Sequence, residues 1–136
     1  MKKNNCPLES WEQEQIFAWR DKMKQQYPIL ALMHSSGNGL RLTPGTAVKA
    51  KKQGLTKGIP DIFLPTPIAL DNHGFDMCYG LFIELKRADK SKSIISPEQK
   101  IILAALNNQG YKAIVCYGHK DAIQEIKNYL GITDEN

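Results

Sequence analysis

The sequence predicts an α/β fold in which helices cover the faces of a central β-sheet. Segments with apolar residues at helical intervals alternate with short runs of apolar and β-branched residues, which is the pattern of such a sheet. The chain has 136 residues, of which 42% are hydrophobic and 24% are charged. This length allows one sizeable core, and no repeat or linker divides the chain. We therefore expect a single domain over residues 1–136.

The first half of the chain is expected to form a helix, a strand and a short helix. The helix is predicted over residues 10–27, because Ser10 and Gln13 have the spacing of a capping box and apolar residues follow at helical intervals. The apolar run 29–33 predicts a buried strand that leads into a glycine-rich loop. A second helix is expected from about residue 46 to residue 53.

The second half is expected to contribute three strands and two helices. Strict alternation places Glu84 and Lys86 on one face of their strand and three leucine or isoleucine side chains on the other. Ser96 begins a helix, because a proline occupies the first helical position and Gln99 closes a capping box. The strands are predicted at 61–64, 81–86 and 113–117, the helices at 96–110 and 122–130, and a loop at 69–76.

Composition excludes several classes of protein. No apolar run approaches the roughly 18 residues that span a bilayer, and no apolar signal segment follows the N-terminal MKKNN. We expect a soluble, cytoplasmic protein without a membrane partner. Cys6, Cys78 and Cys116 form no CxxC pair, which argues against a disulfide framework and against a zinc site. The net charge of +4 permits binding to a polyanion.

Glu84 and Lys86 are the first candidates for chemistry, because they lie two residues apart on an otherwise apolar strand. Burying either charge alone would cost several kcal/mol, so each needs a compensating group. A salt bridge on a half-exposed sheet face is the simplest explanation. Asp61 offers another, since it begins the adjacent predicted strand directly after Pro60. Carboxylates from two neighbouring strands can share a divalent cation, and their hard oxygen ligands suit Mg²⁺ or Mn²⁺.

Three motifs surround these residues, namely GIPD at 58–61, FIELKR at 82–87 and SPEQ at 96–99. In this order, and with an acidic helix upstream, they resemble the VRR-NUC (virus-type replication-repair nuclease) branch of the PD-(D/E)XK superfamily. The resemblance covers most of the chain. It implies a restriction-endonuclease-like core with a central mixed β-sheet flanked by helices.

The resemblance also implies an active site. Asp61 and Glu84 would bind the metal ion, and Lys86 would position or activate the attacking water. A glutamate of the first helix would complete the site, and Gln99 would lie beside it. These are the roles that the family gives to residues at the matching positions of its motifs.

Glu12 is expected to be the glutamate from the first helix. It shares a helical face with Ile16 and Trp19, where a carboxylate is costly unless it meets a cation or a hydrogen-bond donor. Glu9, one turn earlier, is the alternative ligand, and a solvated acid at the positive end of the helix is the explanation without a site. Gln99 also has a second role open to it, because it closes a capping box whether or not it touches the site.

Basic residues flank both halves of the predicted site. One cluster precedes Asp61 and another follows Glu84. Such clusters supply sequence-independent contacts to phosphates, although each alone is also typical of a solvated face. The residues expected to bind nucleic acid are Lys49, Lys51, Lys52, Lys57, Arg87 and Lys90.

These features together predict a Mg²⁺- or Mn²⁺-dependent endodeoxyribonuclease that hydrolyses phosphodiester bonds in DNA repair. Because the chain is large enough only for a catalytic core, we expect two copies to pair on a four-way (Holliday) junction, whose symmetry matches that of a homodimer. A monomeric flap or nicking endonuclease is the alternative enzyme. A non-catalytic nucleic-acid-binding module is the alternative from another class, and its carboxylates would be structural.

Overall fold

The computed structural model describes residues 5–133, and these form an α/β fold. The strands are β1 (His34–Ser35), β2 (Ile62–Leu64), β3 (Ile68–Ala69), β4 (Met77–Cys78), β5 (Leu81–Lys86) and β6 (Lys112–Tyr117). The helices are α1 (Glu9–Met23), α2 (Pro44–Lys52), α3 (Pro97–Asn108) and α4 (His119–Leu130), with short 3₁₀ helices η1 (Pro28–Leu32) and η2 (Lys90–Lys92). None of the helices among these residues is long and apolar enough to cross a bilayer.

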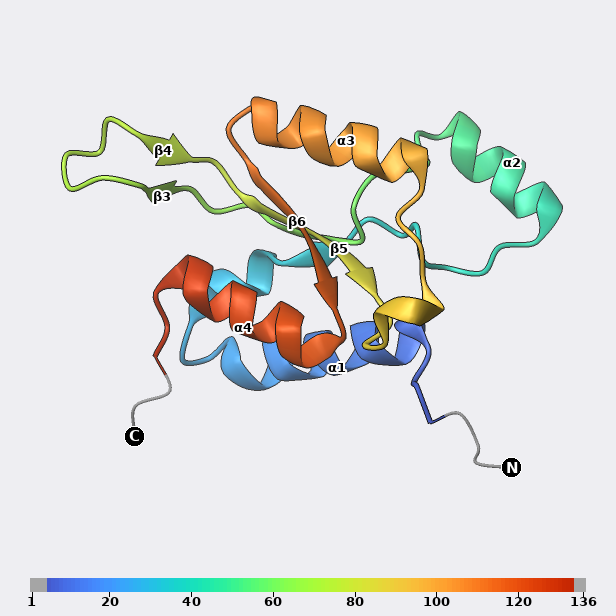
Figure 1. Cartoon of the computed structure of the whole chain (residues 1–136), viewed down its shortest axis with the longest axis horizontal. Helices are drawn as coiled ribbons and strands as arrows, with labels where there is room; N and C mark the ends of the chain where they lie inside the picture. The colour runs from blue at the N-terminus through green and yellow to red at the C-terminus, as the bar shows by residue number, and fades with distance from the viewer. Residues whose placement is uncertain (1–4, 134–136) are drawn as a thin grey trace.

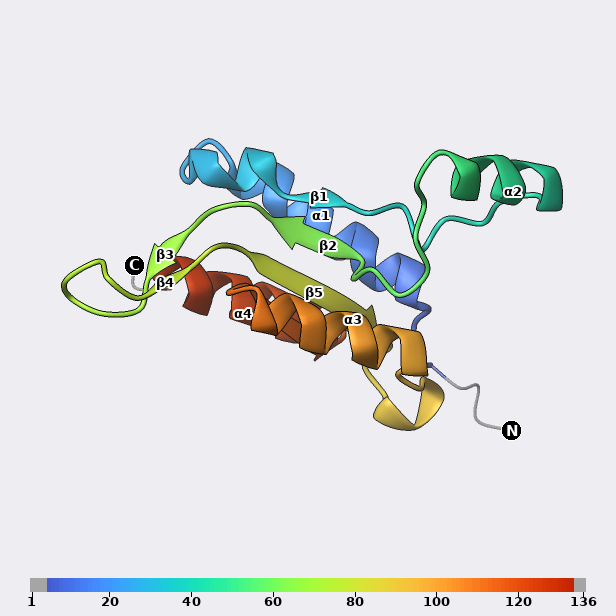
Figure 2. The same cartoon turned by 90° about the horizontal axis from the view of Figure 1, so that it is seen from above.

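The main sheet has four strands in the order β1-β2-β5-β6. Strands β5 and β6 run parallel, whereas β1 with β2 and β2 with β5 run antiparallel, so the predicted mixed sheet is confirmed. Strands β3 and β4 form a separate antiparallel ribbon. Figure 1 shows α3 on one face of the sheet and α1 with α4 on the other. Seen from above, α2 projects beyond the end of the sheet toward which β5 runs (Figure 2).

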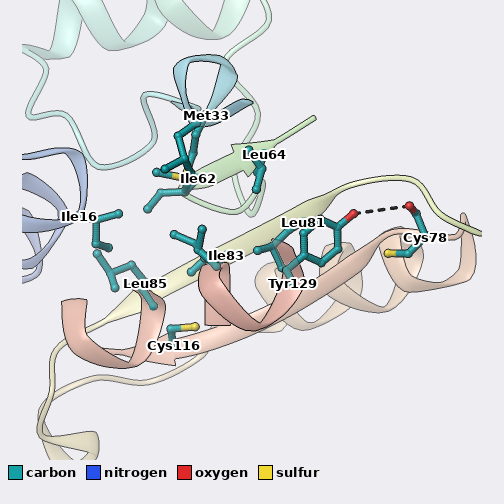
Figure 3. Close-up of a cluster of buried hydrophobic side chains, with 13 residues drawn as sticks. Ile16, Met33, Ile62, Leu64, Cys78, Leu81, Ile83, Leu85, Cys116 and Tyr129 are labelled. Atoms are coloured by element: carbon teal, nitrogen blue, oxygen red, sulfur yellow. Dashed lines mark hydrogen bonds between the residues drawn. The ribbon is translucent and has the colours of Figure 1, made fainter. Parts of the chain in front are cut away.

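The hydrophobic core lies between the sheet and the pair of helices α1 and α4 (Figure 3). Ile16 of α1, Leu85 of β5 and Ile126 of α4 are fully buried, each side chain stabilising the fold by about 1.5–3 kcal/mol. The alternation predicted for β5 is confirmed, because its leucines and its isoleucine enter this core while its charged residues face α3. The core therefore fixes the orientation of β5, and with it the direction of its polar side chains.

Two predictions about strands need correction. Residues 29–33, expected as a strand, lie largely in the 3₁₀ helix η1, which has proline in its first turn, where the missing N–H is not needed. The strand begins only at His34. The loop predicted at 69–76 is found between β3 and β4, but these two short strands were not predicted.

The capping box predicted at the start of the first helix is also wrong. Helix α1 begins one residue earlier, after Leu8, and no side chain caps it. Gln13 instead donates from Nε2 to Ser35 Oγ at 3.1 Å, which joins α1 to the end of β1. The capping box predicted at Ser96 is confirmed.

Candidate active site

The strand register brings Asp61 and Glu84 together. In the pairing of β2 with β5, Ile62 lies opposite Ile83, so Asp61, directly before β2, is carried to a position across from Glu84. Asp61 Oδ2 accepts a hydrogen bond of 2.7 Å from the backbone N–H of Leu85. Both acids are buried, with 5% of Asp61 and 2% of Glu84 exposed. The sheet itself therefore fixes the two carboxylates.

Glu9, the first residue of α1, supplies a third carboxylate to the same place. One oxygen atom from each of Glu9, Asp61 and Glu84 lies within 4.8 Å of the others. Glu9 is half-buried, whereas the other two are buried. We call these three residues the carboxylate group. Three carboxylate oxygens at this spacing form the kind of hard-ligand set that binds Mg²⁺ or Mn²⁺.

Burial raises the pKa of all three acids. It raises the pKa of Glu84 to about 8, aided by the charge of Asp61 and opposed by the ammonium of Lys86. Burial also raises the pKa of Asp61, although the hydrogen bond from Leu85 lowers it in part. The pKa of Glu9 is raised by burial and then by Asp61. Acids with raised pKa values that converge in this way are typical of a cation-binding site, because an added positive charge would favour their ionised forms.

Gln99 of α3 connects Glu84 to Lys86. Lys86 is 6% exposed, and its Nζ lies 3.5 Å from Glu84 Oε1. Gln99 donates from Nε2 to Glu84 Oε1 at 2.8 Å and accepts at Oε1 from Lys86 Nζ at 3.0 Å. The same Oε1 accepts from the backbone N–H of Ser96 at 2.8 Å, which closes the capping box. The two roles open to Gln99 are therefore both present in one side chain.

Glu12, the expected third ligand, lies outside the carboxylate group, and Glu9, the alternative, lies within it. Glu12 is buried as its helical face predicts, with 2% exposed. Its Oε2 lies 2.5 Å from both the backbone nitrogen and the ring Nδ1 of His119, at the start of α4. The buried carboxylate is therefore satisfied by hydrogen-bond donors. The sequence carried no signal for this pair, because His119 is 107 residues away.

Arg87, which is also expected to bind phosphate, contacts the segment that leads into α1. Its Nε donates to the carbonyl of Pro7 at 3.0 Å, and its Nη2 donates to the carbonyl of Cys6 at 2.6 Å. Because Pro7 is two residues before Glu9, these bonds help to hold the third carboxylate in place. This role was not predicted from the sequence. A basic residue that follows β5 gives the same sequence pattern whether it binds a phosphate or holds a neighbouring segment.

The predicted phosphate-binding lysines are exposed at the surface. Helix α2 has no buried residue and projects from the sheet (Figures 1 and 2). Lys57 forms an exposed ion pair of 3.5 Å with Glu98, and Lys90 Nζ lies 4.8 Å from the centre of the Tyr117 ring. The lysines on α2 are Lys49, Lys51 and Lys52.

Comparisons with known proteins agree with this geometry. The sequence profile of the VRR-NUC domain matches residues 5–120. The chain belongs to the VRR-NUC family. A solved structure described as a VRR-NUC domain protein is similar, with a TM-score of 0.71 and 25% identity, over 97% of this chain and 95% of the other. No curated protein matches the chain.

VRR-NUC domains are nuclease domains, so the resemblance inferred from the motifs is confirmed and the protein is a nuclease of this family with a DNA substrate. The matched residues run from before Glu9 to beyond Gln99 and so include the whole carboxylate group and its lysine. The nuclease-like core is likewise confirmed by the similar solved structure.

Proposed function

We propose that this VRR-NUC protein is a Mg²⁺- or Mn²⁺-dependent endodeoxyribonuclease that cuts branched DNA, acting in the cytoplasm in DNA repair. The observation that carries the proposal is the carboxylate group, in which Glu9, Asp61 and Glu84 bring three oxygen atoms within 4.8 Å. Buried acids so close together repel one another when ionised, and a cation is the partner that relieves this repulsion.

The donor set fits a hard divalent cation, because every proposed ligand is a carboxylate oxygen and the group contains no sulfur or imidazole. When bound, the cation supplies positive charge to the scissile phosphate and acidifies a water molecule. Lys86 holds a second positive charge beside Glu84, and Gln99 fixes its position. Lys86 therefore orients the attacking water and stabilises the negative charge that develops during displacement.

Manganese binding distinguishes Glu9 from Glu12 as the third ligand. Millimolar Mn²⁺ is expected to raise the melting temperature of the wild-type protein, because a ligand that binds only the folded state stabilises it by about 2.7 kcal/mol at a hundredfold excess over Kd. Glu9→Gln should lose most of this increase. Glu12→Gln should keep it while melting lower without metal, since it weakens the contact with His119. Differential scanning fluorimetry with and without Mn²⁺ measures both, and the reverse pattern would restore Glu12 as the ligand.

A four-way junction is the preferred substrate, cut by a homodimer. Two copies related by a two-fold axis would present two active sites, each with its own Glu9, Asp61 and Glu84, to a substrate of matching symmetry. Ile94, which is 86% exposed in the segment between β5 and α3, offers an apolar contact for the second copy, whereas Ile95 is half-buried. The lysines of α2 would contact phosphates on the arms of the junction.

The test is a panel of labelled junction, flap, nicked and plain duplex DNA, incubated with and without Mg²⁺. We expect cleavage only with the metal, fastest on the junction, and paired cuts that linearise a plasmid carrying a cruciform. Light scattering should give the mass of a dimer. A monomer that prefers flaps or only nicks the plasmid supports the flap-nuclease alternative, and no cleavage of any substrate supports a binding module.

A further inference from the structure

A cavity of about 260 Å³ lies directly beside the carboxylate group. One wall is a face of α1, and the other is formed by the end of β1 and the loop that follows it. Glu9 lines the cavity and also belongs to the carboxylate group, so the cavity and the proposed metal site share this side chain. The residues that line the cavity include Glu9, Gln13, Glu14, Phe17, Gly39 and Leu40.

The loop wall is held in place by hydrogen bonds to backbone carbonyls of the segment that leads into β2. Asn38 donates from Nδ2 to the carbonyls of Thr56 at 3.0 Å and Ile59 at 2.9 Å. The backbone N–H of Ser36 donates to the carbonyl of Asp61 at 2.9 Å. The loop is therefore tied on both sides to the segment that ends in a proposed metal ligand. A group bound in the cavity would sit at a fixed position relative to the scissile phosphate.

The lining of the cavity selects against phosphate. Glu9 and Glu14 are acidic, and the lining contains no lysine or arginine among the described residues. Phe17 and Leu40 supply apolar surface, and Leu40 is 69% exposed. Gln13 uses its Nε2 to bind Ser35, which leaves its Oε1 to accept a hydrogen bond. A flat, uncharged group with amino donors and an apolar face matches this surface, and a nucleobase has that chemistry.

We propose that the cavity receives the base of an unpaired nucleotide next to the scissile phosphate. The proposal rests on the proposed nuclease function and narrows its substrate class to branched DNA in which a nucleotide at the cleavage position is unpaired or leaves its stack. A base in a duplex cannot reach the cavity while it stays stacked, and a base at a branch point leaves its stack at little cost. The base packs against Phe17 and Leu40, and its amino group donates to Gln13 or Glu14. Branch selectivity then resides in the catalytic domain itself.

The experiment begins with a branched substrate whose cleavage position has been mapped, with the flanking nucleotides then replaced one at a time by abasic sites. For the wild type we expect one replacement to slow cleavage about tenfold, the loss typical of one stacked base, and the others to have little effect. Gly39→Leu should abolish this difference by filling the cavity. A Cβ at Gly39 meets only Gln13 Oε1, at 3.8 Å, and the backbone there is outside the left-handed region, so the fold tolerates the change.

Gly45→Leu is the matched control, because it makes the same change on α2, where an added Cβ meets nothing within 4 Å. It should retain the preference for the base over the abasic site. The stabilisation of Gly39→Leu by Mn²⁺ should equal that of the wild type, which separates a filled cavity from a damaged metal site. Equal cleavage of base-containing and abasic DNA by the wild type, or a preference that survives in Gly39→Leu, would overturn the proposal.

A binding measurement separates this proposal from the proposed nuclease activity. Asp61→Asn is mixed with branched DNA that carries 2-aminopurine at each position around the branch point in turn, and the fluorescence is recorded. A change on binding that disappears in Asp61→Asn/Gly39→Leu supports the cavity even if no cleavage is found. An unchanged signal at every flanking position means that the cavity holds no base. Absence of cleavage by the wild type, with the fluorescence change intact, would reject the nuclease mechanism and leave the base site standing.

Discussion

Asp61→Asn and Glu84→Gln are each expected to reduce DNA cleavage below detection, by roughly a thousandfold or more. Each change removes one negative ligand and keeps the shape of the side chain. Asparagine at position 61 can still accept the 2.7 Å hydrogen bond from Leu85, and glutamine at position 84 can still accept from Gln99. The loss should therefore come from the chemistry and not from the fold.

The same substitutions that abolish cleavage should increase the stability of the metal-free protein. The size of this increase should depend on pH. The pKa of Glu84 is raised from 4.5 to about 8 in the folded state, so the folded protein holds a proton that the unfolded chain has lost between these values. Stability should thus fall as pH rises from about 4.5 to about 8, by an amount on the order of a few kcal/mol. Glu84→Gln resembles the protonated acid and should remove this part of the slope.

Thermal melts in a chelator at about pH 5 and about pH 9 measure this effect, with the wild type and Glu84→Gln compared at each pH. Glu84→Gln should be more stable than the wild type at about pH 9, where Glu84 of the wild type is ionised, and the difference should be smaller at about pH 5. Added Mn²⁺ should stabilise the wild type and have little effect on either variant. A wild type that is more stable at the higher pH without metal would contradict the proton held at Glu84. Cleavage at the wild-type rate by either variant would show that the substituted acid is not needed for catalysis.

Lys86→Met should slow cleavage by about a hundredfold or more while leaving DNA affinity nearly unchanged, because one preorganised charge at the transition state is typically worth that much. The lysine is 6% exposed and bound to Glu84 and Gln99, so it lies too deep to be an ordinary phosphate contact. Methionine keeps the apolar length of the side chain and avoids a cavity. Single-turnover rates with saturating enzyme measure the chemical step separately from binding.

Lys52→Ala is the control for this variant, since it removes a positive charge from exposed α2. It should weaken binding and reduce the salt dependence of the affinity by about one phosphate contact, with an unchanged rate at saturation. Affinities over a range of salt concentrations provide the comparison. If both variants lose binding equally and cut at the wild-type rate when saturated, Lys86 would be only another contact to the DNA backbone.

The elements that sequence predicted best are those with strong periodicity or a clear cap. Alternation in β5 placed Glu84 and Lys86 on one face, and Ser96 with its proline marked the start of α3. The run 29–33 failed because a short apolar segment fits a buried helical turn as well as a strand, and only its tertiary surroundings decide between them. Strands of two residues, as in β3, are too short to leave a periodic signal.

The roles of the two acids of α1 could be predicted only in part from the sequence. The helical face correctly predicted that Glu12 is buried and needs a partner. It could not say which partner, because His119 and Asp61 reach α1 from distant parts of the chain. Glu9 lies beside Asp61 and Glu84 because Arg87 holds the segment before α1, which places the first turn of that helix next to the sheet. Contacts of this kind depend on the angle at which a helix packs, and the angle is not encoded locally.

Gln99 makes the rigidity of the active site depend on a local unfolding equilibrium. Its amide oxygen serves both the first turn of α3 and the ammonium of Lys86, so neither bond survives if that turn frays. Helix ends open with much smaller free energies than the global transition. Each brief opening would release Lys86 from Gln99 while the core beneath stays folded. On the proposed mechanism, the Ser96 cap would therefore set the fraction of time during which Lys86 is held in place for the reaction.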